Sequence, residues 1–264
     1  MSDSDLILCD TDERGVSQLK LNRAEKHNAF DDTLINAITH SLNALSDLGH
    51  TRVLVLGSMG KSFSAGGDLE WMKKTAAYSP EENQADAERL AGMLTALNNF
   101  PAPVIARVQG AAFGGGVGLV ACCDIAVAST AAKFSLSEVR LGLIPATISP
   151  FVIDAIGARQ ARRYFLSAER FDAETAKHIG LVHEVVDPEQ LDTQVDALVT
   201  QLLTCGPAAQ KQAKQLIRDL QYSTRDETLA VETSRRIAMV RASAEGQEGV
   251  GAFLEKREPD WIKP

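Results

Sequence analysis

The glycine run at residues 110–119 contains the residues that point most directly to chemistry. It places four glycines within the five positions 114–118, after an apolar strand pattern at Val104–Val108 and within an apolar helix pattern that ends before Asp124. Glycine allows a ligand to approach the backbone closely. The first N–H groups of a helix lack intrahelical partners and lie at the positive end of its dipole. The run therefore predicts a site for a negative ligand oxygen.

Two familiar phosphate-binding motifs do not fit the glycine run. No Gly-Lys-Ser/Thr sequence follows it, which excludes a P-loop. A dinucleotide fingerprint opens an N-terminal unit and carries an acid about 20 residues further on, whereas Asp124 comes too soon. A tight packing junction between helix and strand is the alternative, and it accounts more easily for one or two glycines than for four. We therefore predict an oxyanion site.

A second loop of small residues supports this interpretation. The buried strand pattern at Arg52–Gly57 leads into an upstream loop at residues 58–68, and a helix pattern follows from Leu69 to about Tyr78. Backbone donors from two such loops can converge on one developing oxyanion. Removal of one such donor typically costs about 100- to 1,000-fold in rate.

Composition limits the classes of function. The 264 residues are 45% hydrophobic, enough for one domain of ordinary size with a helical appendage. A net charge of -8 argues against non-specific binding of nucleic acid, which requires a basic surface. No apolar run is long enough to span a membrane. The acidic start Met1–Asp5 lacks the features of a targeting peptide, so we expect a cytoplasmic protein. The four cysteines have no metal-like spacing, and no metal is expected.

The pattern of elements predicts α/β architecture, because strand and helix patterns alternate over most of the chain. From about Pro188 onward the strand patterns vanish, so we divide the chain into a core at residues 1–190 and a helical region at 191–264. The individual expectations are strands at Asp5–Leu8, Val16–Leu21 and Asp124–Ala128, a helix capped by Asp31 or Asp32 and ended by Gly49, and a helix from the capping box at Ser79–Glu82 to about Asn99.

Six segments, in this order, give the chain a specific resemblance to the crotonase (enoyl-CoA hydratase/isomerase) superfamily. They are Leu21–Arg23 with Asn28–Ala29, Phe63–Leu69, Gly110–Leu119, Cys123–Ile125, Phe134–Pro145 and Ala252–Arg257. The resemblance implies a spiral of ββα repeats with a C-terminal helical trimerisation region. It also implies an acyl-CoA thioester substrate, with coenzyme A as part of that substrate and no separate cofactor.

The same resemblance implies the assembly. It predicts a homotrimer or a dimer of trimers. Apolar positions of the C-terminal helices would be buried by such a closed assembly. They include Leu198, Leu202, Leu203, Leu216, Ile217, Leu220, Leu229, Ile237 and Val240.

The catalytic residues implied by the resemblance are Gly67, Gly115 and Glu138. The backbone N–H groups of Gly67 and Gly115 would hold the thioester oxygen. Many hydratases of the family use two glutamates, and here Gly118 occupies the place of the first. A single carboxylate at Glu138 could take a proton from water and return it to C2. The apolar residues around Glu138 favour a pocket-facing carboxylate over a surface one, and Gly118→Ala is expected to be mild because alanine is the better helix former by about 1 kcal/mol.

Binding residues are implied in the same way. Lys26 and Ala29 would lie near the nucleotide end of the coenzyme, and Ala65 would offer its carbonyl to the adenine. Phe253 and Lys256 would reach the coenzyme of a neighbouring subunit. An acyl pocket is expected from Trp71, Met72 and Tyr78. A substrate carboxylate could meet Lys73, Lys74 or Arg140, although each of these could equally be a solvated charge.

Within the superfamily, the chain looks most like the bacterial 3-methylglutaconyl-CoA hydratases and their isohexenylglutaconyl-CoA relatives. The similarity lies in Val108–Gly115, Cys122–Asp124 and Leu136–Leu143, and in the loss of the first glutamate. It implies hydration of a branched, carboxylated enoyl-CoA in leucine or acyclic terpene breakdown. An isomerase that uses Glu138 as a proton shuttle is the first alternative. A non-catalytic acyl-CoA-binding protein is the second, and it would be expected to lack Glu138.

Overall fold

Two sheets form the body of the protein in the computed structural model, which describes residues 6–262. Strands β1 and β9 pair antiparallel with their neighbours, and the other pairings are parallel. The larger sheet has six strands in the order β1 (Ile7–Thr11), β2 (Val16–Leu21), β3 (Val53–Ser58), β5 (Val104–Val108), β7 (Ile125–Ser129) and β10 (Glu184–Val186). The smaller has four, in the order β4 (Ser62–Ser64), β6 (Ala111–Phe113), β8 (Lys133–Ser135) and β9 (Phe171–Asp172).

The chain passes between the two sheets in a repeating manner. Strands β3, β5 and β7 join the larger sheet, and β4, β6 and β8, which directly follow them, join the smaller one. Helices then lead to the next repeat: α3 (Leu69–Thr75) and α4 (Pro80–Asn98) after β4, α5 (Gly115–Cys122) after β6, and α6 (Ser149–Ser167) after β8. The predicted α/β spiral of ββα repeats is therefore confirmed. Because β4, β6 and β8 run parallel, the loops that follow them lie at the same edge of the smaller sheet.

Local signals in the sequence set the ends of the helices. The Asp31 carboxylate accepts a hydrogen bond from the Leu34 N–H at 2.8 Å and begins α2 (Asp32–Leu48), which ends at Gly49 with φ 67°. The capping box at Ser79 and Glu82 begins α4. These predictions are confirmed. The first strand is corrected from Asp5–Leu8 to Ile7–Thr11, because its polar half still pairs with β2 up to Ser17. Met1–Asp5 lies outside the described residues.

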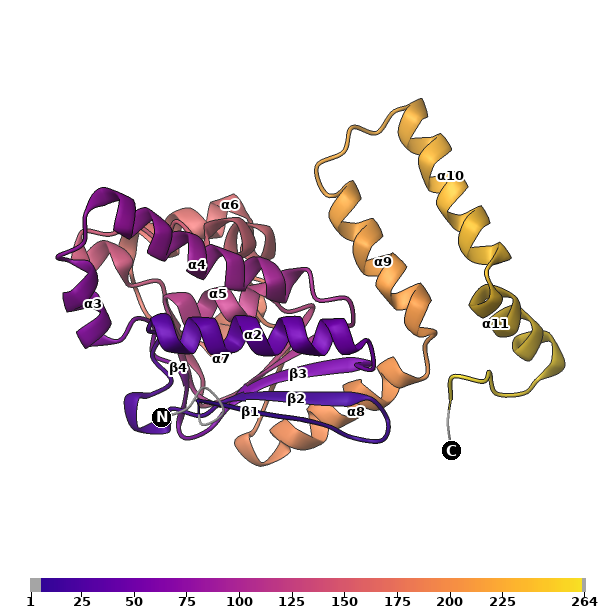
Figure 1. The fold of residues 1–264 in the computed structure, drawn as a ribbon, viewed down its shortest axis with the longest axis horizontal. Helices are drawn as coiled ribbons and strands as arrows, with labels where there is room; N and C mark the ends of the chain where they lie inside the picture. The colour runs from indigo at the N-terminus through magenta and orange to yellow at the C-terminus, as the bar shows by residue number, and fades with distance from the viewer. Residues whose placement is uncertain (1–5, 263–264) are drawn as a thin grey trace.

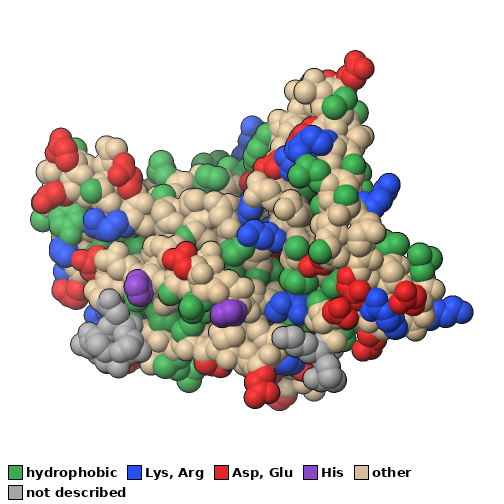
Figure 2. Space-filling view, turned by 45° about the vertical axis from the view of Figure 1, so that its right-hand side comes forward, with side chains coloured by type: hydrophobic (Ala, Val, Ile, Leu, Met, Phe, Trp, Pro, Cys, Tyr) green, Lys and Arg blue, Asp and Glu red, His purple; other side chains and the backbone are tan. Residues whose placement is uncertain are grey.

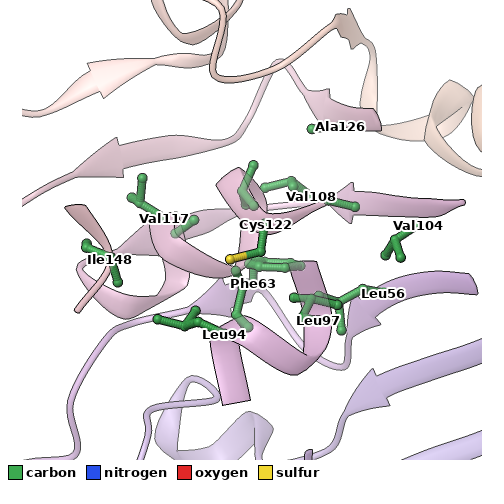
Figure 3. Packing of buried hydrophobic residues seen from close by; sticks show 14 of the residues in the cluster. Leu56, Phe63, Leu94, Leu97, Val104, Val108, Val117, Cys122, Ala126 and Ile148 are labelled. Carbon is green, nitrogen blue, oxygen red and sulfur yellow. The ribbon is translucent and has the colours of Figure 1, made fainter. Parts of the chain in front are cut away.

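The main core lies between the sheets and the helices that cover them. Phe63, Leu94, Val117 and Ile148 come from four different elements or loops and pack against one another around α5 (Figure 3). Within α5, six of the eight residues are buried. The glycine run thus begins a helix that is mostly buried.

Helix α8 (Leu191–Leu203) belongs to a second, smaller core. Its Leu191, Val195 and Val199 are buried with apolar residues of β2, β3, β5 and β7. Leu198, Leu202 and Leu203 pack against the same cluster. These three leucines are only half-buried by the chain's own sheet, and their burial at a subunit interface stays a prediction.

The last three helices form an arm. Figure 1 shows α9 (Pro207–Leu220), α10 (Glu227–Ala242) and α11 (Ala244–Glu255) standing away from the body. Among the described residues, β10 is the last strand, and the short helices α7 (Ala173–His178) and η3 (Pro188–Gln190) flank it. The predicted helical C-terminal part is confirmed, and the domain boundary at residue 190 stays a prediction. Large apolar side chains are exposed on this arm, including Ile217, Val231, Ile237, Met239, Val250, Phe253 and Leu254.

The surface of the arm mixes apolar and charged side chains (Figure 2). Among the helices between residues 6 and 262, none combines the length and the apolar character that crossing a bilayer requires.

Candidate active site

The structure brings the upstream loop and the glycine run together. Strand β4 pairs in parallel with β6, with Ser64 opposite Ala112, so the loops that follow the two strands start side by side. A Cβ added to Gly66 would lie 3.1 Å from the Phe113 carbonyl oxygen, and one added to Gly114 would lie 4.0 Å from the Gly66 Cα. Both glycines also have positive φ, at 89° and 50°. Close approach and backbone conformation therefore both require glycine here.

The N–H groups of Gly67 and Gly115 are available as donors. The neighbouring Asp68 N–H donates to the Phe30 carbonyl at 2.7 Å, and the Gly114 N–H donates to the Ser135 carbonyl at 2.9 Å. In contrast, the Gly67 and Gly115 N–H groups donate no hydrogen bond within residues 6–262. Gly67 is exposed and Gly115, the first residue of α5, is half-buried. A ligand oxygen placed against these two loops could accept from such unpaired donors.

Phe30 supports both loops, although it was not among the residues predicted for the site. Its N–H donates to the Gly66 carbonyl at 2.7 Å, and its backbone forms an isolated bridge with Gly67. Its ring lies where a Cβ on Gly115 would come within 2.8 Å of Cε2. The buried ring therefore closes the space beneath the glycine run. The signal in the sequence is weak: a large apolar residue directly before the helix cap Asp31.

Glu138 lies against the glycine run from the other side. It is the first residue of a short 3-10 helix, η2 (Glu138–Leu141), and its Oε1 lies 3.1 Å from where a Cβ on Gly114 would be. Its Oε2 is buried and has no hydrogen-bond partner among residues 6–262. Burial raises the pKa of this carboxyl above its ordinary value, which makes the carboxylate a stronger base.

The apolar surroundings of Glu138 come only in part from its own segment. Leu136 is buried, but Leu141 and Leu143 are 60% and 55% exposed. The environment that excludes water from Glu138 Oε2 therefore comes from tertiary packing, which the residues next to Glu138 in sequence do not reveal.

Apolar side chains fill the space beside Gly118, the position at which the resemblance would place the first glutamate. A Cβ on Gly118 would lie 2.3 Å from Ile148 Cγ2 and 3.5 Å from Leu94 Cδ2. Contacts under 3.0 Å require something to move, and Ile148 is itself buried. The expectation that Gly118→Ala is mild is therefore wrong, and a second carboxylate has no space at this position.

Gly118→Ala is instead expected to destabilise the protein, since overpacking of a core typically costs about 1–3 kcal/mol. Gly92→Ala is the matched control, because Gly92 also lies in a helix but a Cβ there would meet nothing within 4 Å. Urea unfolding of both variants measures the difference. Equal free energies of unfolding would contradict the packing seen around Gly118.

Asp68 anchors the end of the upstream loop. One carboxylate oxygen caps α3 by accepting from the Glu70 and Trp71 N–H groups at 2.9 and 3.2 Å. The other lies 3.0 Å from Lys26 Nζ. Burial alone would raise the pKa of Asp68, but the Lys26 hydrogen bond and the two backbone donors outweigh it and hold the pKa below its ordinary value. The carboxylate is thus charged and ties the Lys26 segment to α3.

The residues predicted for the nucleotide end lie close to this anchor. Lys26 ends the short helix η1 (Ala24–Lys26), and its side chain is 44% exposed. Ala29 is buried, and its carbonyl oxygen accepts from Arg23 at 3.1 Å. Ala65 is half-buried, and its N–H donates to the His27 carbonyl at 3.0 Å. Their contact with a coenzyme stays a prediction.

Two of the predicted acyl-pocket residues flank Gly67. A Cβ on Gly67 would lie 3.4 Å from Met72 Sδ and 3.6 Å from Trp71 Cε3. The Trp71 indole N–H is buried without a partner in the part of the chain that the structure describes. Tyr78 is half-buried, beyond the end of α3, which stops at Thr75 rather than continuing to Tyr78.

The three cations considered for a substrate carboxylate differ in their surroundings. Lys73 pairs with Glu70 and Lys74 pairs with Asp32, each at 2.9 Å. Arg140 is exposed on η2 and forms no ion pair with any residue between 6 and 262. Arg140 is therefore the most available of the three.

Phe253 and Lys256 lie elsewhere. Phe253 is 82% exposed on α11, and Lys256 follows at the end of that helix with φ 58°. Figure 1 places α11 on the opposite side of the molecule from α3. Within one chain these two residues therefore do not reach the glycine loops. No cluster of three or more His, Cys, Asp or Glu side chains suited to a metal occurs within residues 6–262.

Comparison with known proteins identifies the family of this chain. A sequence model of the family described as enoyl-CoA hydratase/isomerase matches residues 11–264. The chain belongs to the enoyl-CoA hydratase/isomerase family. The predicted membership of the crotonase superfamily is thus confirmed, and an acyl-CoA thioester substrate is consistent with it.

Individual relatives match over nearly the whole chain. The crystal structure of an enoyl-CoA hydratase from Shewanella pealeana superposes with a TM-score of 0.94 at 45% identity, covering 97% of this chain and 96% of that one. An enoyl-CoA hydratase structure from Mycobacterium smegmatis gives 0.92 at 35% identity, with coverage of 98% and 99%. Crotonyl-CoA hydratase of Syntrophomonas wolfei is 31% identical over 95% of both chains.

Proposed function

We propose that this member of the family is a hydratase that adds water to a branched, carboxylated 2-enoyl-CoA thioester such as 3-methylglutaconyl-CoA. The observation that carries the proposal is the position of Glu138 against Gly114, near the Gly67 and Gly115 N–H groups, which donate no hydrogen bond within residues 6–262. The relatives named as hydratases support the reaction. The substrate class rests on the resemblance of segments such as Val108–Gly115 and Leu136–Leu143 to methylglutaconyl-CoA hydratases, and on Arg140, which forms no ion pair within residues 6–262.

The proposed mechanism uses one carboxylate. The thioester oxygen accepts hydrogen bonds from Gly67 and Gly115, which stabilise the enolate that forms as water attacks C3. Glu138 takes a proton from that water, and the hydroxyl oxygen bonds to C3. The enolate then collapses, and Glu138 returns its proton to C2 on the same face. Water is consumed, and Glu138 ends in its starting state.

An isomerase is the second candidate, because one buried base beside an enolate site can also move a proton between C2 and C4. Such a reaction shifts the double bond and consumes no water. A non-catalytic acyl-CoA-binding protein is the third, and it would bind the thioester without turning it over. The presence of Glu138 argues against a non-catalytic protein, which would be expected to lack it.

Arg140→Gln tests the substrate class. If Arg140 meets the distal carboxylate, the variant should raise KM for 3-methylglutaconyl-CoA by about 10-fold or more, since a hydrogen bond to a charged group contributes about 1.5–3 kcal/mol. The KM for crotonyl-CoA, which has no distal carboxylate, should change less than twofold. Lys73→Gln is the control, because Lys73 already pairs with Glu70. Equal shifts for both substrates would contradict the role of Arg140.

We also propose that the chain assembles as a trimer or a dimer of trimers. Its support is the arm, where Ile237, Met239 and Phe253 are exposed by 55%, 60% and 82%. Burial of such side chains is a strong driving force for association. Assembly would also allow Phe253 and Lys256 to reach a neighbour's coenzyme. Light scattering should give three or six times the chain mass of 28.4 kDa, and a stable monomer at micromolar concentration would contradict the proposal.

A further inference from the structure

Arg23 connects the cap of α2 to the cap of α3, at the end of the upstream loop. Its side chain is only 10% exposed, and its NH1 group lies 2.7 Å from the Asp31 carboxylate. The same NH1 donates to the Ala29 carbonyl at 3.1 Å, and NH2 lies 3.4 Å from the Asp68 carboxylate. Asp31 caps α2 and Asp68 caps α3. One planar guanidinium thus fixes the distance between these caps.

The segments that Arg23 connects are those that hold Gly67. Phe30 lies directly before Asp31. Its N–H donates to the Gly66 carbonyl, and its carbonyl accepts from the Asp68 N–H. Gly67 lies between these two hydrogen-bonded residues, and its own N–H donates no hydrogen bond within residues 6–262. A change in the spacing of the caps would therefore rotate or shift the Gly67 N–H.

Lys26 cannot provide this anchor by itself. It is the other cation on Asp68, but its side chain is 44% exposed, whereas that of Arg23 is 10% exposed. If Lys26 turns toward the nucleotide end of a bound coenzyme, near which it is predicted to lie, Arg23 remains as the buried partner of Asp68. A buried carboxylate that loses all its cationic partners is strongly destabilised.

We infer that Arg23 is a positioning residue for catalysis, which holds the Gly67 N–H in place for the thioester oxygen while Lys26 engages the coenzyme. This inference rests on the proposed function. Arg23 does not touch the substrate and acts through Asp68 and Phe30. Small misplacements of a catalytic group can cost about 100-fold in rate, so the effect should appear in turnover.

Arg23→Lys and Asp68→Asn, alone and together, test the inference. Lysine keeps the charge but lacks the planar fork, and asparagine keeps a good helix cap without the negative charge. We expect kcat to fall about 10- to 100-fold in each single variant, with KM within threefold. Because the two residues act as a unit, the double variant should be little worse than Asp68→Asn alone. Arg107→Lys is the control. Arg107 lies on β5 and forms an ion pair at 2.5 Å with Asp192 of α8, which belongs to neither of the two glycine loops.

A second readout separates positioning from folding. Acetoacetyl-CoA forms an enolate whose ultraviolet absorbance reports how well the site stabilises a thioester oxyanion. We expect the bound enolate fraction at fixed pH to fall about tenfold in Arg23→Lys and to stay unchanged in Arg107→Lys.

Two results would overturn the inference. The first is a kcat within twofold of wild type in Arg23→Lys. The second is a loss of kcat that matches the loss of folded protein while the enolate fraction of the folded protein is normal. If the wild type hydrates no enoyl-CoA, the proposed function fails, but the enolate titration still decides on Arg23.

Discussion

Glu138→Gln is expected to lower kcat for hydration by about 100-fold or more while the Kd for the CoA thioester changes only a few-fold. General acid–base catalysis by a positioned side chain contributes about 10²- to 10⁴-fold. The amide keeps the shape of the side chain beside Gly114 and removes the base. Because the base acts only during proton transfer, the loss should appear in kcat and not in KM. Steady-state kinetics and a thioester titration measure both quantities.

The free energy of unfolding of Glu138→Gln shows whether its loss of kcat comes from the missing base or from misfolding. Burial raises the folded-state pKa of Glu138, so the contribution of this group to stability declines as the pH rises through that pKa. Above it, ionised Glu138 is a cost to the folded state, and Glu138→Gln should unfold no more easily than wild type at neutral pH. Glu189→Gln, at an exposed position in η3, should leave turnover unchanged. Turnover near the wild-type level in Glu138→Gln would exclude the single-carboxylate mechanism.

Gly115→Val is expected to lower kcat/KM by about 100- to 1,000-fold, which is the usual cost of one lost oxyanion donor. Even the first added carbon would lie 2.8 Å from the Phe30 ring, so either the ring or the Gly115 backbone must move. Either movement displaces the N–H that we propose as a donor to the thioester oxygen. The measurement is kcat/KM for hydration per folded molecule, with the folded fraction taken from thermal unfolding.

Gly92→Ala serves again as the control for Gly115→Val, because its Cβ would meet nothing within 4 Å. It should retain wild-type kcat/KM. If folded Gly115→Val is as active as Gly92→Ala, then the glycine run is a packing junction and Gly115 is no oxyanion donor.

The sequence predicts the features that depend on local chemistry. Asp31 and Ser79 cap helices because a side-chain oxygen satisfies an N–H group two or three residues away. The helix caps need no knowledge of distant contacts, and the structure reproduces them. The upstream loop and the glycine run were expected to converge, but the strands β4 and β6 that pair in parallel and bring them together were not predicted.

Contacts between distant parts of the chain were not predictable in this way. Ile148 fills the space beside Gly118, and the Phe30 ring lies beneath Gly115, but no spacing or periodicity relates these pairs. Apolar periodicity likewise identifies the buried face of a helix without naming its partner. Leu198 packs on the chain's own sheet, whereas Ile237 on the arm stays exposed.

The proposed hydration is tested by following the reaction itself in oxygen-18 water. Purified protein is incubated with 3-methylglutaconyl-CoA, with crotonyl-CoA in parallel, and the products are identified by mass spectrometry. Hydration through Glu138 predicts a 3-hydroxyacyl-CoA that carries one oxygen-18 atom at C3, formed faster from the carboxylated substrate. An unlabelled product with a shifted double bond would contradict hydration in favour of isomerisation, and binding without any product would contradict catalysis altogether.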